Sequence, residues 1–359
     1  MELVWNGKTN EVTNVVLPFQ VIEQVDEPRA EKPEEMAVQP GLFDERGRQL
    51  KGWTNKLIWG DNKLILSSLK NGPLRDEIES QCGLKLIYID PPFDVGADFS
   101  MDIEVGEETF IKRPSILEEI AYRDTWGKGA DSFIAMIYER LNLMRGLLSS
   151  DGSIFVHCDW RVTQHIRSIL DELFSPACYR NEIIWHHQVI GTPRTNPSRF
   201  AKSYETIYWY SRSASGYIFN YKDENVRVPW SEDTFKSMRQ DEDGRWYYER
   251  RRTGTNNSGA YDARFLRTYV EDPQLGKTAS DVWDDLPSYR PKTIDKTGYS
   301  TQKPNELVAR MIACCSNPAI LWPIFSVVLA LWRMSRSDWE ENGSAPTSES
   351  LRFTLRANA

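Results

Sequence analysis

The pattern of apolar and polar residues changes near residue 55. Residues 23–48 alternate acids, bases, Pro and Gly without a period, which predicts an arm that buries little, with Leu17–Gln20 as a candidate anchor. From residue 55 onward, short apolar runs alternate with segments whose apolar residues recur every three or four positions. The expected strands are Lys56–Trp59, Leu84–Ile89, Ser153–Cys158 and Asn181–Trp185. The expected helices are Lys63–Leu69, Ser132–Ser149, Val162–Phe174 and Asn305–Cys314.

Strands and helices in alternation predict an α/β fold with a doubly wound, Rossmann-like sheet. Residues 186–290 break the pattern, because they are rich in Arg, Tyr, Trp, Asn, Gly and Ser and have no long periodic element. We expect them to form an inserted, loop-rich recognition region. The chain thus divides into an acidic N-terminal arm (1–54), the first half of the sheet (55–185), the recognition region (186–290), a segment with one further helix (291–318) and a tail (319–359).

Composition and charge exclude several classes of protein. With 40% hydrophobic and 12% aromatic residues in 359, the chain has material for a real core, so a disordered or fibrous protein is excluded. The net charge of −8 excludes a uniformly basic nucleic-acid coat protein but not a local basic surface. Residues 1–50 hold ten acids against five bases, a net of −5, which leaves −3 for the remainder.

Cysteine spacing and hydropathy indicate the compartment. The five cysteines form no C-x-x-C pair, which favours reduced thiols over disulfides or a zinc site, and no metal is expected. No early apolar segment of signal-peptide type and no 18-residue apolar run precede residue 319. These features predict a soluble, cytoplasmic protein without a membrane partner.

The tetrapeptide Asp90-Pro91-Pro92-Phe93 follows the apolar run LKLIYI directly. Two prolines fix φ and remove two N–H donors, so the backbone there offers only carbonyl oxygens beside a carboxylate. Such an acceptor-rich corner suits an exocyclic amino group, whose two hydrogens it would accept, and an aromatic ring next to it can stack on a flat base. The alternative for the bare tripeptide is a simple turn after a strand.

Further segments in a fixed order give this tetrapeptide its context. With DPPF, they resemble the β-class DNA amino-methyltransferases that methylate adenine N6 or cytosine N4, and are similar to modification subunits of type III restriction systems. The segments are WGDNKLILSSL, LLSSDGSIFVHCD (Leu147–Asp159), NEIIW (Asn181–Trp185), YETIYWYSRS (Tyr204–Ser213), DVWDDLP (Asp281–Pro287) and YSTQKPNELVARMI (Tyr299–Ile312). The resemblance covers residues 55–318 and makes 55–185 the catalytic half and 291–318 the cofactor side.

The resemblance implies a role for each residue of the tetrapeptide. Asp90 accepts the hydrogens of the target amino group, and Pro91 lends its carbonyl while Pro92 holds the backbone. Phe93 stacks on a base flipped out of the duplex. His157, near the end of a strand, is expected to be a hydrogen-bonded core or rim histidine rather than a catalyst.

The cofactor implied by the resemblance is S-adenosyl-L-methionine. The residues expected to lie against it are Thr301, Gln302, Lys303 and Pro304. Pro304 falls in the first turn of a helix, where proline is well tolerated, so an ordinary helix start is the alternative reading of this segment. Asp61 either faces the cofactor or the active pocket or is a simple turn residue.

Basic and aromatic residues alternate in the recognition region. Contacts to phosphate combined with stacking would use such residues, and the candidates for DNA binding are Arg245, Trp246, Tyr247, Arg250 and Arg251. Residues 221–260 also hold eight positive and eight negative charges, so a solvated surface of mixed charge is the alternative for any single Arg.

The chain departs from the family after Pro318. The family has a strand and a glycine-rich turn there, D-x-F-x-G-S-G-T, whereas this chain has no glycine before Gly343. If one nucleotide were lost just after the codon for Pro318, permitted codons for Ile324–Leu331 would have encoded DFFCGSGT. We therefore hypothesise that the tail is out of frame. A divergent ending with a buried strand or helix at IFSVVLALW is the alternative.

The resemblance implies an adenine-N6 DNA methyltransferase in a restriction-modification setting, since Asp at the first motif position is the commoner adenine pattern. Alternatives are an N4-cytosine enzyme, a catalytically dead DNA-binding remnant, and methylation of RNA or protein. The expected partner is double-stranded DNA, with a second copy of the chain and a restriction subunit as further candidates. The altered tail leaves open whether this chain is active.

Overall fold

The computed structural model describes most of the sheet, the helices and the inserted region. The described residues are 3–5, 8, 14–19, 58, 62–80, 82–91, 101–105, 108–112, 130–186, 200, 202–255, 261–287, 303–315, 326–330 and 355–356. The expected strand Lys56–Trp59 lies outside them apart from Ile58. The other expected strands and helices of residues 62–186 and the helix after Pro304 are confirmed, with ends shifted by a few residues.

A seven-stranded mixed sheet forms the centre of the molecule, in the order β12-β5-β6-β4-β1-β13-β14. β1 is parallel to β4 and β13, and β6 lies antiparallel between β4 and β5. The strands are β1 (Leu84–Asp90), β4 (Leu148–Cys158), β5 (Tyr179–His186), β6 (Tyr204–Ser211), β12 (Val282–Trp283), β13 (Ser326–Ala330) and β14 (Leu355–Arg356). β1 is almost entirely buried, as a strand covered on both faces must be.

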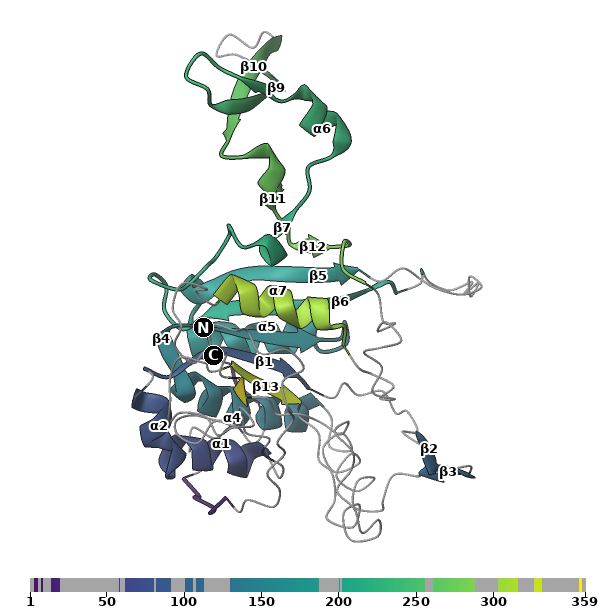
Figure 1. Ribbon diagram of the computed structural model, residues 1–359. Helices are drawn as coiled ribbons and strands as arrows, with labels where there is room; N and C mark the ends of the chain where they lie inside the picture. The colour runs from purple at the N-terminus through teal and green to yellow at the C-terminus, as the bar shows by residue number, and fades with distance from the viewer. Residues whose placement is uncertain are drawn as a thin grey trace, which may run out of the picture.

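Helices cover both faces of this sheet (Figure 1). One face packs on α1 (Asn62–Asn71), α2 (Leu74–Ser80), α4 (Ala130–Leu147) and α5 (Thr163–Phe174). The other face packs on α7 (Asn305–Cys315). Successive residues of β1 alternate between the two cores, with Ile87 and Ile89 facing the first and Leu86 and Tyr88 the second. The expected doubly wound α/β architecture follows from this arrangement.

β4 begins earlier than its apolar run suggests. The expected helix end at Ser149 is wrong, because α4 ends at Leu147 and β4 starts at Leu148, with a register shift relative to β1 before Ser153. At this shift the backbones approach closely, since a Cβ on Gly152 would lie 2.6 Å from the carbonyl oxygen of Leu84. Glycine therefore permits the shift.

Short N-terminal segments are anchored on the helices. The backbone N–H of Leu3 donates to Glu172 of α5 at 2.8 Å, and the ammonium of Lys8 contacts the same carboxylate at 2.6 Å. The backbone N–H of Leu17 donates to Ser68 Oγ of α1 at 2.9 Å. The expected anchor at Leu17 is therefore confirmed.

The region expected to be a loop-rich insertion, 186–290, is corrected in one respect. Tyr204–Ser211 is not part of an insertion, since β6 is a central strand of the sheet. Val282–Trp283 also belongs to the sheet, as its strand β12. The described residues 224–255 and 261–278 form an arm that projects from the β5 side of the sheet (Figure 1). Its elements are η3 (Glu224–Val226), β7 (Arg227–Val228), α6 (Glu232–Ser237), β8 (Arg239–Gln240), β9 (Trp246–Thr255), β10 (Tyr261–Val270), η4 (Pro273–Leu275) and β11 (Lys277–Thr278).

Three smaller features complete the fold. β2 (Met101–Val105) and β3 (Glu108–Lys112) form a hairpin, and η2 (Pro176–Cys178) is a 3-10 turn before β5. The apolar segment of the tail forms a strand rather than a helix, and β13 pairs with β1 so that Ala330 lies opposite Asp90. Across the described part of the chain, no helix has the length and apolar character needed to cross a bilayer.

Candidate active site at the carboxyl end of β1

Asp90 is the last residue of β1, and Pro91 follows it in a buried position. The strand ends here because a proline cannot donate to a sheet ladder. β1 lies between two parallel neighbours, β4 and β13, at the middle of the sheet. The carboxylate of Asp90 is thus at the carboxyl edge of a parallel sheet, where open α/β folds bind ligands. Pro92 and Phe93 lie outside the described residues.

Lys303 reaches Asp90 from the far end of the sequence. Its Nζ lies 3.5 Å from Asp90 Oδ2 and donates to Glu205 Oε2 at 3.0 Å. The lysine side chain is only 10% exposed. Lys303 directly precedes Pro304 in the chain. The carbonyl oxygen of Pro304 accepts from the N–H of Leu307 in the first turn of α7. The expected helix start at Pro304 is therefore confirmed.

A buried histidine continues the polar cluster behind Glu205. His157 of β4 has no exposed side-chain surface. Its Nδ1 lies 2.9 Å from the hydroxyl of Tyr88, and its Nε2 lies 2.5 Å from Glu205 Oε2, at an angle that is not that of a hydrogen bond. The expectation that His157 is a partnered core histidine is confirmed.

An aromatic wall closes the cluster. The indole of Trp185 on β5 is fully buried. The Lys303 ammonium lies 5.9 Å from the centre of this ring, and the imidazole of His157 meets it edge-on at 5.8 Å. A cation above an indole face is attracted by the ring quadrupole, so the wall attracts the Lys303 ammonium.

Cys158 follows His157 and does not serve as a nucleophile. Burial raises the pKa of its thiol well above the ordinary value, and the neighbouring carboxylates, Glu182 first, raise it further. A protonated thiol is a poor nucleophile and a poor metal ligand. Within the described ranges, no group of three His, Cys, Asp or Glu residues could hold a metal ion, and all five cysteines are free.

Glu205 and Tyr88 are site residues that sequence reasoning missed. Glu205 is the one acid in the strand YETIYWYS, and Tyr88 is the one hydroxyl in LKLIYID. The available signal was a lone carboxylate in one mostly apolar strand and a hydroxyl inside the apolar run of the other, because burying such groups requires partners. Of the predicted cofactor residues, Lys303 lies beside Asp90 and Pro304 is buried next to it in the chain, while Asp61, Thr301 and Gln302 lie outside the described residues.

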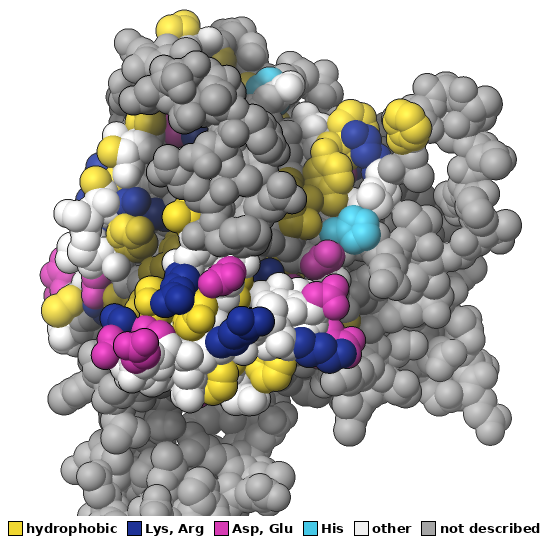
Figure 2. All heavy atoms as spheres, turned by 90° about the horizontal axis from the view of Figure 1, so that it is seen from above, with side chains coloured by type: hydrophobic (Ala, Val, Ile, Leu, Met, Phe, Trp, Pro, Cys, Tyr) yellow, Lys and Arg dark blue, Asp and Glu magenta, His cyan; other side chains and the backbone are white. Residues whose placement is uncertain are grey.

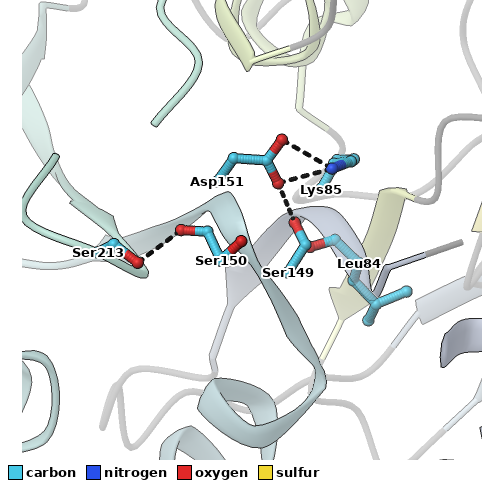
Figure 3. A network of polar contacts seen from close by, with 6 residues as sticks. All are labelled: Leu84, Lys85, Ser149, Ser150, Asp151 and Ser213. Atoms are coloured by element: carbon cyan, nitrogen blue, oxygen red, sulfur yellow. Dashed lines mark hydrogen bonds and ion pairs between the residues drawn. The ribbon is translucent and has the colours of Figure 1, made fainter. Parts of the chain in front are cut away.

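The opposite end of β1 holds a second polar network (Figure 3). The Lys85 ammonium contacts both oxygens of Asp151, at 2.6 and 2.8 Å, and the hydroxyl of Ser149 donates to the same carboxylate. Burial raises the pKa of Asp151, but the hydrogen bonds from Lys85 and Ser149 outweigh it and the net shift is downward. Ser213 donates to the carbonyl oxygen of Ser150 nearby. This network fixes the start of β4 and lies away from Asp90.

The projecting arm places the predicted DNA-binding residues in different environments. The Arg245 guanidinium is held by two carboxylates, Asp241 and Asp243, each at 2.8 Å. Tyr247 is buried, and the Arg267 guanidinium covers its ring at 4.6 Å. Basic and acidic side chains alternate on the face seen from the side of the arm (Figure 2).

The remaining candidates on the arm differ in exposure. Trp246 is half-buried, whereas the side chain of Arg250 is exposed. Arg251 lies in β9, of which only the backbone is described at that position. Arg250 is therefore the candidate whose side chain the structure leaves accessible without a carboxylate partner among the described residues.

Comparison with known proteins identifies relatives of the chain. The family model for DNA methylases of the N6/N4 type matches residues 84–322, about two thirds of the 359 residues. The type II methyltransferase M.EcaI of Enterobacter cloacae is 25% identical over 303 residues, covering 74% of this chain and 60% of that protein. The EcoP15I Mod subunit of Escherichia coli, a type III restriction-modification enzyme, is 28% identical over 174 residues, covering 46% and 25%.

Solved structures show a weaker likeness. The M1.HpyAVI-SAM complex is 15% identical, covers 45% of this chain and 56% of that one, and has a TM-score of 0.27. A putative DNA modification methylase from Thermus thermophilus, complexed with S-adenosyl-L-methionine, is 16% identical, covers 50% and 63%, and has a TM-score of 0.26. These TM-scores are too low to assign the fold, which is defined by the strand order of the sheet.

Proposed function

Since the chain belongs to the N6/N4 DNA methylase family, we propose that it transfers a methyl group from S-adenosyl-L-methionine to the exocyclic amino group of a base in DNA. The observation that supports this most is the corner formed by Asp90 and Pro91 at the carboxyl end of β1, with the Lys303 ammonium beside it. The chain spans 60% of M.EcaI and a quarter of the EcoP15I Mod subunit, so the activity of the whole protein belongs to the proposal.

The chain's own residues act on the target amino group. The Asp90 carboxylate and the Pro91 carbonyl accept its two hydrogens, which localises the lone pair on the nitrogen and directs it at an electrophile. S-adenosyl-L-methionine supplies that electrophile as a methyl group bound to a cationic sulfur. Phe93 stacks on the flipped base.

The residues on the cofactor side of the site fit S-adenosyl-L-methionine in part. Lys303, just before α7, lies beside Asp90, and our proposal is that Lys303 and Pro304 line the cofactor pocket together with Thr301, Gln302 and Asp61. The segment after Pro318 does not fit, because residues 319–342 include no glycine that would let the backbone approach a ligand closely.

Methylation of DNA by the purified full chain tests the proposal. With a tritiated methyl donor and genomic DNA, we expect labelled DNA from the wild type and a loss of about 100-fold or more for Asp90→Ala. Lys85→Met, at the opposite end of β1, is the matched control and should keep its activity. Unlabelled DNA from the wild type, or equal labelling by Asp90→Ala, would overturn the proposal.

We propose adenine N6 as the methylated position, because Asp occupies the first place of the DPPF motif. Mass spectrometry of nucleosides from methylated DNA separates N6-methyladenine from N4-methylcytosine, and the latter would refute this choice.

Two further expectations follow from the resemblance: a restriction subunit as partner, as for a Mod subunit, and a second copy of the chain. Co-purification with a restriction subunit tests the first expectation, and the mass of the protein in solution tests the second. We expect the protein to act in the cytoplasm.

A second candidate function is a DNA-binding protein without methyl transfer. The observation that favours it is the missing glycine-rich turn after Pro318, with β13 occupying the place next to β1. Calorimetry with S-adenosyl-L-methionine discriminates the two functions. Binding supports the enzyme, whereas DNA binding without cofactor binding supports the second candidate, and Arg250→Ala should then weaken DNA binding more than Arg245→Ala.

A further inference from the structure

Five polar side chains from four separate parts of the chain meet behind the candidate acceptor. They form one continuous series of contacts, Tyr88 to His157, His157 to Glu205, Glu205 to Lys303 and Lys303 to Asp90. The separations along this series are 2.9, 2.5, 3.0 and 3.5 Å. Of these five residues, Asp90 is the one expected to contact the target base.

Lys303 is the shared element of the series. One ammonium lies between two carboxylates, so it balances one of their two charges and separates them. All three side chains are largely buried, at 10% exposure for Lys303, 18% for Glu205 and 23% for Asp90. Because buried charges are costly unless they are paired, the lysine position is determined by both partners together.

His157 and Tyr88 fix the far end of the series. A neutral imidazole has one donor and one acceptor nitrogen. When Nδ1 accepts from the hydroxyl of Tyr88, Nε2 bears the hydrogen and turns a positive edge toward the Glu205 carboxylate, a close electrostatic contact rather than an aligned hydrogen bond. Since the ring is fully buried and meets Trp185 edge-on, it cannot turn away from Glu205 without displacing its neighbours.

We propose that Glu205 is a positioning residue, which fixes the Lys303 ammonium against Oδ2 of Asp90 and so leaves Oδ1 directed at the amino group to be methylated. The inference rests on the proposed function through the role of Asp90. In this arrangement Lys303 pairs with the acceptor carboxylate, and the buried His157 and Tyr88 orient Glu205. Contacts that hold a reacting group in place act on turnover, since a displacement of about 1 Å can cost about 100-fold.

Steady-state kinetics of five variants of the full chain tests the proposal. Glu205→Gln and Lys303→Met should each lower kcat about 10- to 100-fold while the KM for DNA changes less than about threefold. The double variant should be no slower than the slower single variant, because both changes break one linkage. Lys303→Arg should recover part of kcat. Lys85→Met breaks the ion pair between Lys85 of β1 and Asp151 of β4, and it should leave kcat unchanged.

A second measurement does not depend on activity. Chemical unfolding of the wild type, Lys303→Met, Asp90→Asn and the corresponding double variant gives a coupling between the two side chains, expected at about tenfold in the unfolding constant. An inactive wild type that shows this coupling would refute the proposed function but keep the arrangement. Absence of coupling, a change in KM alone, or additive losses of kcat would overturn the positioning role of Glu205.

Discussion

The contact between Arg310 of α7 and Asp285 allows a quantitative prediction. Arg310 is buried, with 6% of its side chain exposed, and both terminal nitrogens donate to the Asp285 carboxylate at 2.9 and 2.5 Å. Its Nε donates to the carbonyl oxygen of Asn225 at 2.8 Å, and its guanidinium lies 5.2 Å from the centre of the Trp283 ring. One side chain therefore joins α7 to the base of the projecting arm.

Replacing Asp285 by Asn removes the charge opposite Arg310 and keeps the shape. Leaving a fully buried charge unpaired costs about 3–5 kcal/mol. Asp285 is 36% exposed, and the Asn225 and Trp283 contacts remain, so we reduce the expected loss to about 2 kcal/mol of unfolding free energy. For a chain of this size that corresponds to a fall in Tm of about 2–3 °C.

Urea unfolding and calorimetry of Asp285→Asn measure this loss. Asp284→Asn is the matched control, because Asp284 is exposed on the same loop. The pKa of Asp285 is lowered, first by the hydrogen bond from Arg310, so its contribution is present above the unfolded pKa and is lost as the pH falls through the folded pKa. The two variants should thus converge on the wild type in acid. Equal stability of Asp285→Asn and Asp284→Asn at neutral pH would refute this reasoning.

Three other predictions follow. Burial raises the pKa of Glu172, but Lys8 and the N–H of Leu3 lower it overall, so the protection factor of the Leu3 amide, corrected for intrinsic exchange, should fall as the pH falls below about 4.5, and Glu172→Gln should show this loss of protection already at neutral pH; an unchanged protection factor would contradict it. Phe155→Ala should cost about 3–4 kcal/mol in urea unfolding, because the ring is fully buried and stacks on Trp209 at 5.5 Å, and a loss below about 1 kcal/mol would refute the packing argument. Inserting one nucleotide after the codon for Pro318 should produce a chain that binds S-adenosyl-L-methionine more tightly by calorimetry than the present one, and sequencing that finds this nucleotide in the genome would confirm the out-of-frame tail; equal affinity of the two chains would contradict it.

Local pattern was sufficient for the elements and for one end of the site. Apolar periodicity is set by neighbours along the chain, so it predicted β1, α5 and α7 and placed Asp90 at the end of a buried strand. It located ends less well, as at Ser149, because pairing with β1 rather than side-chain period determines where β4 begins.

The tertiary structure alone decided which polar groups meet. Tyr88, His157, Glu205 and Lys303 are far apart in sequence, and their contacts depend on the order of the strands, with β6 inserted antiparallel beside β4. Strand order and register arise from long-range packing, which no local period encodes. The sequence by itself therefore determined the elements and the place of Asp90 at the end of a buried strand, whereas the sheet topology determined that a lysine shared with Glu205 lies next to it.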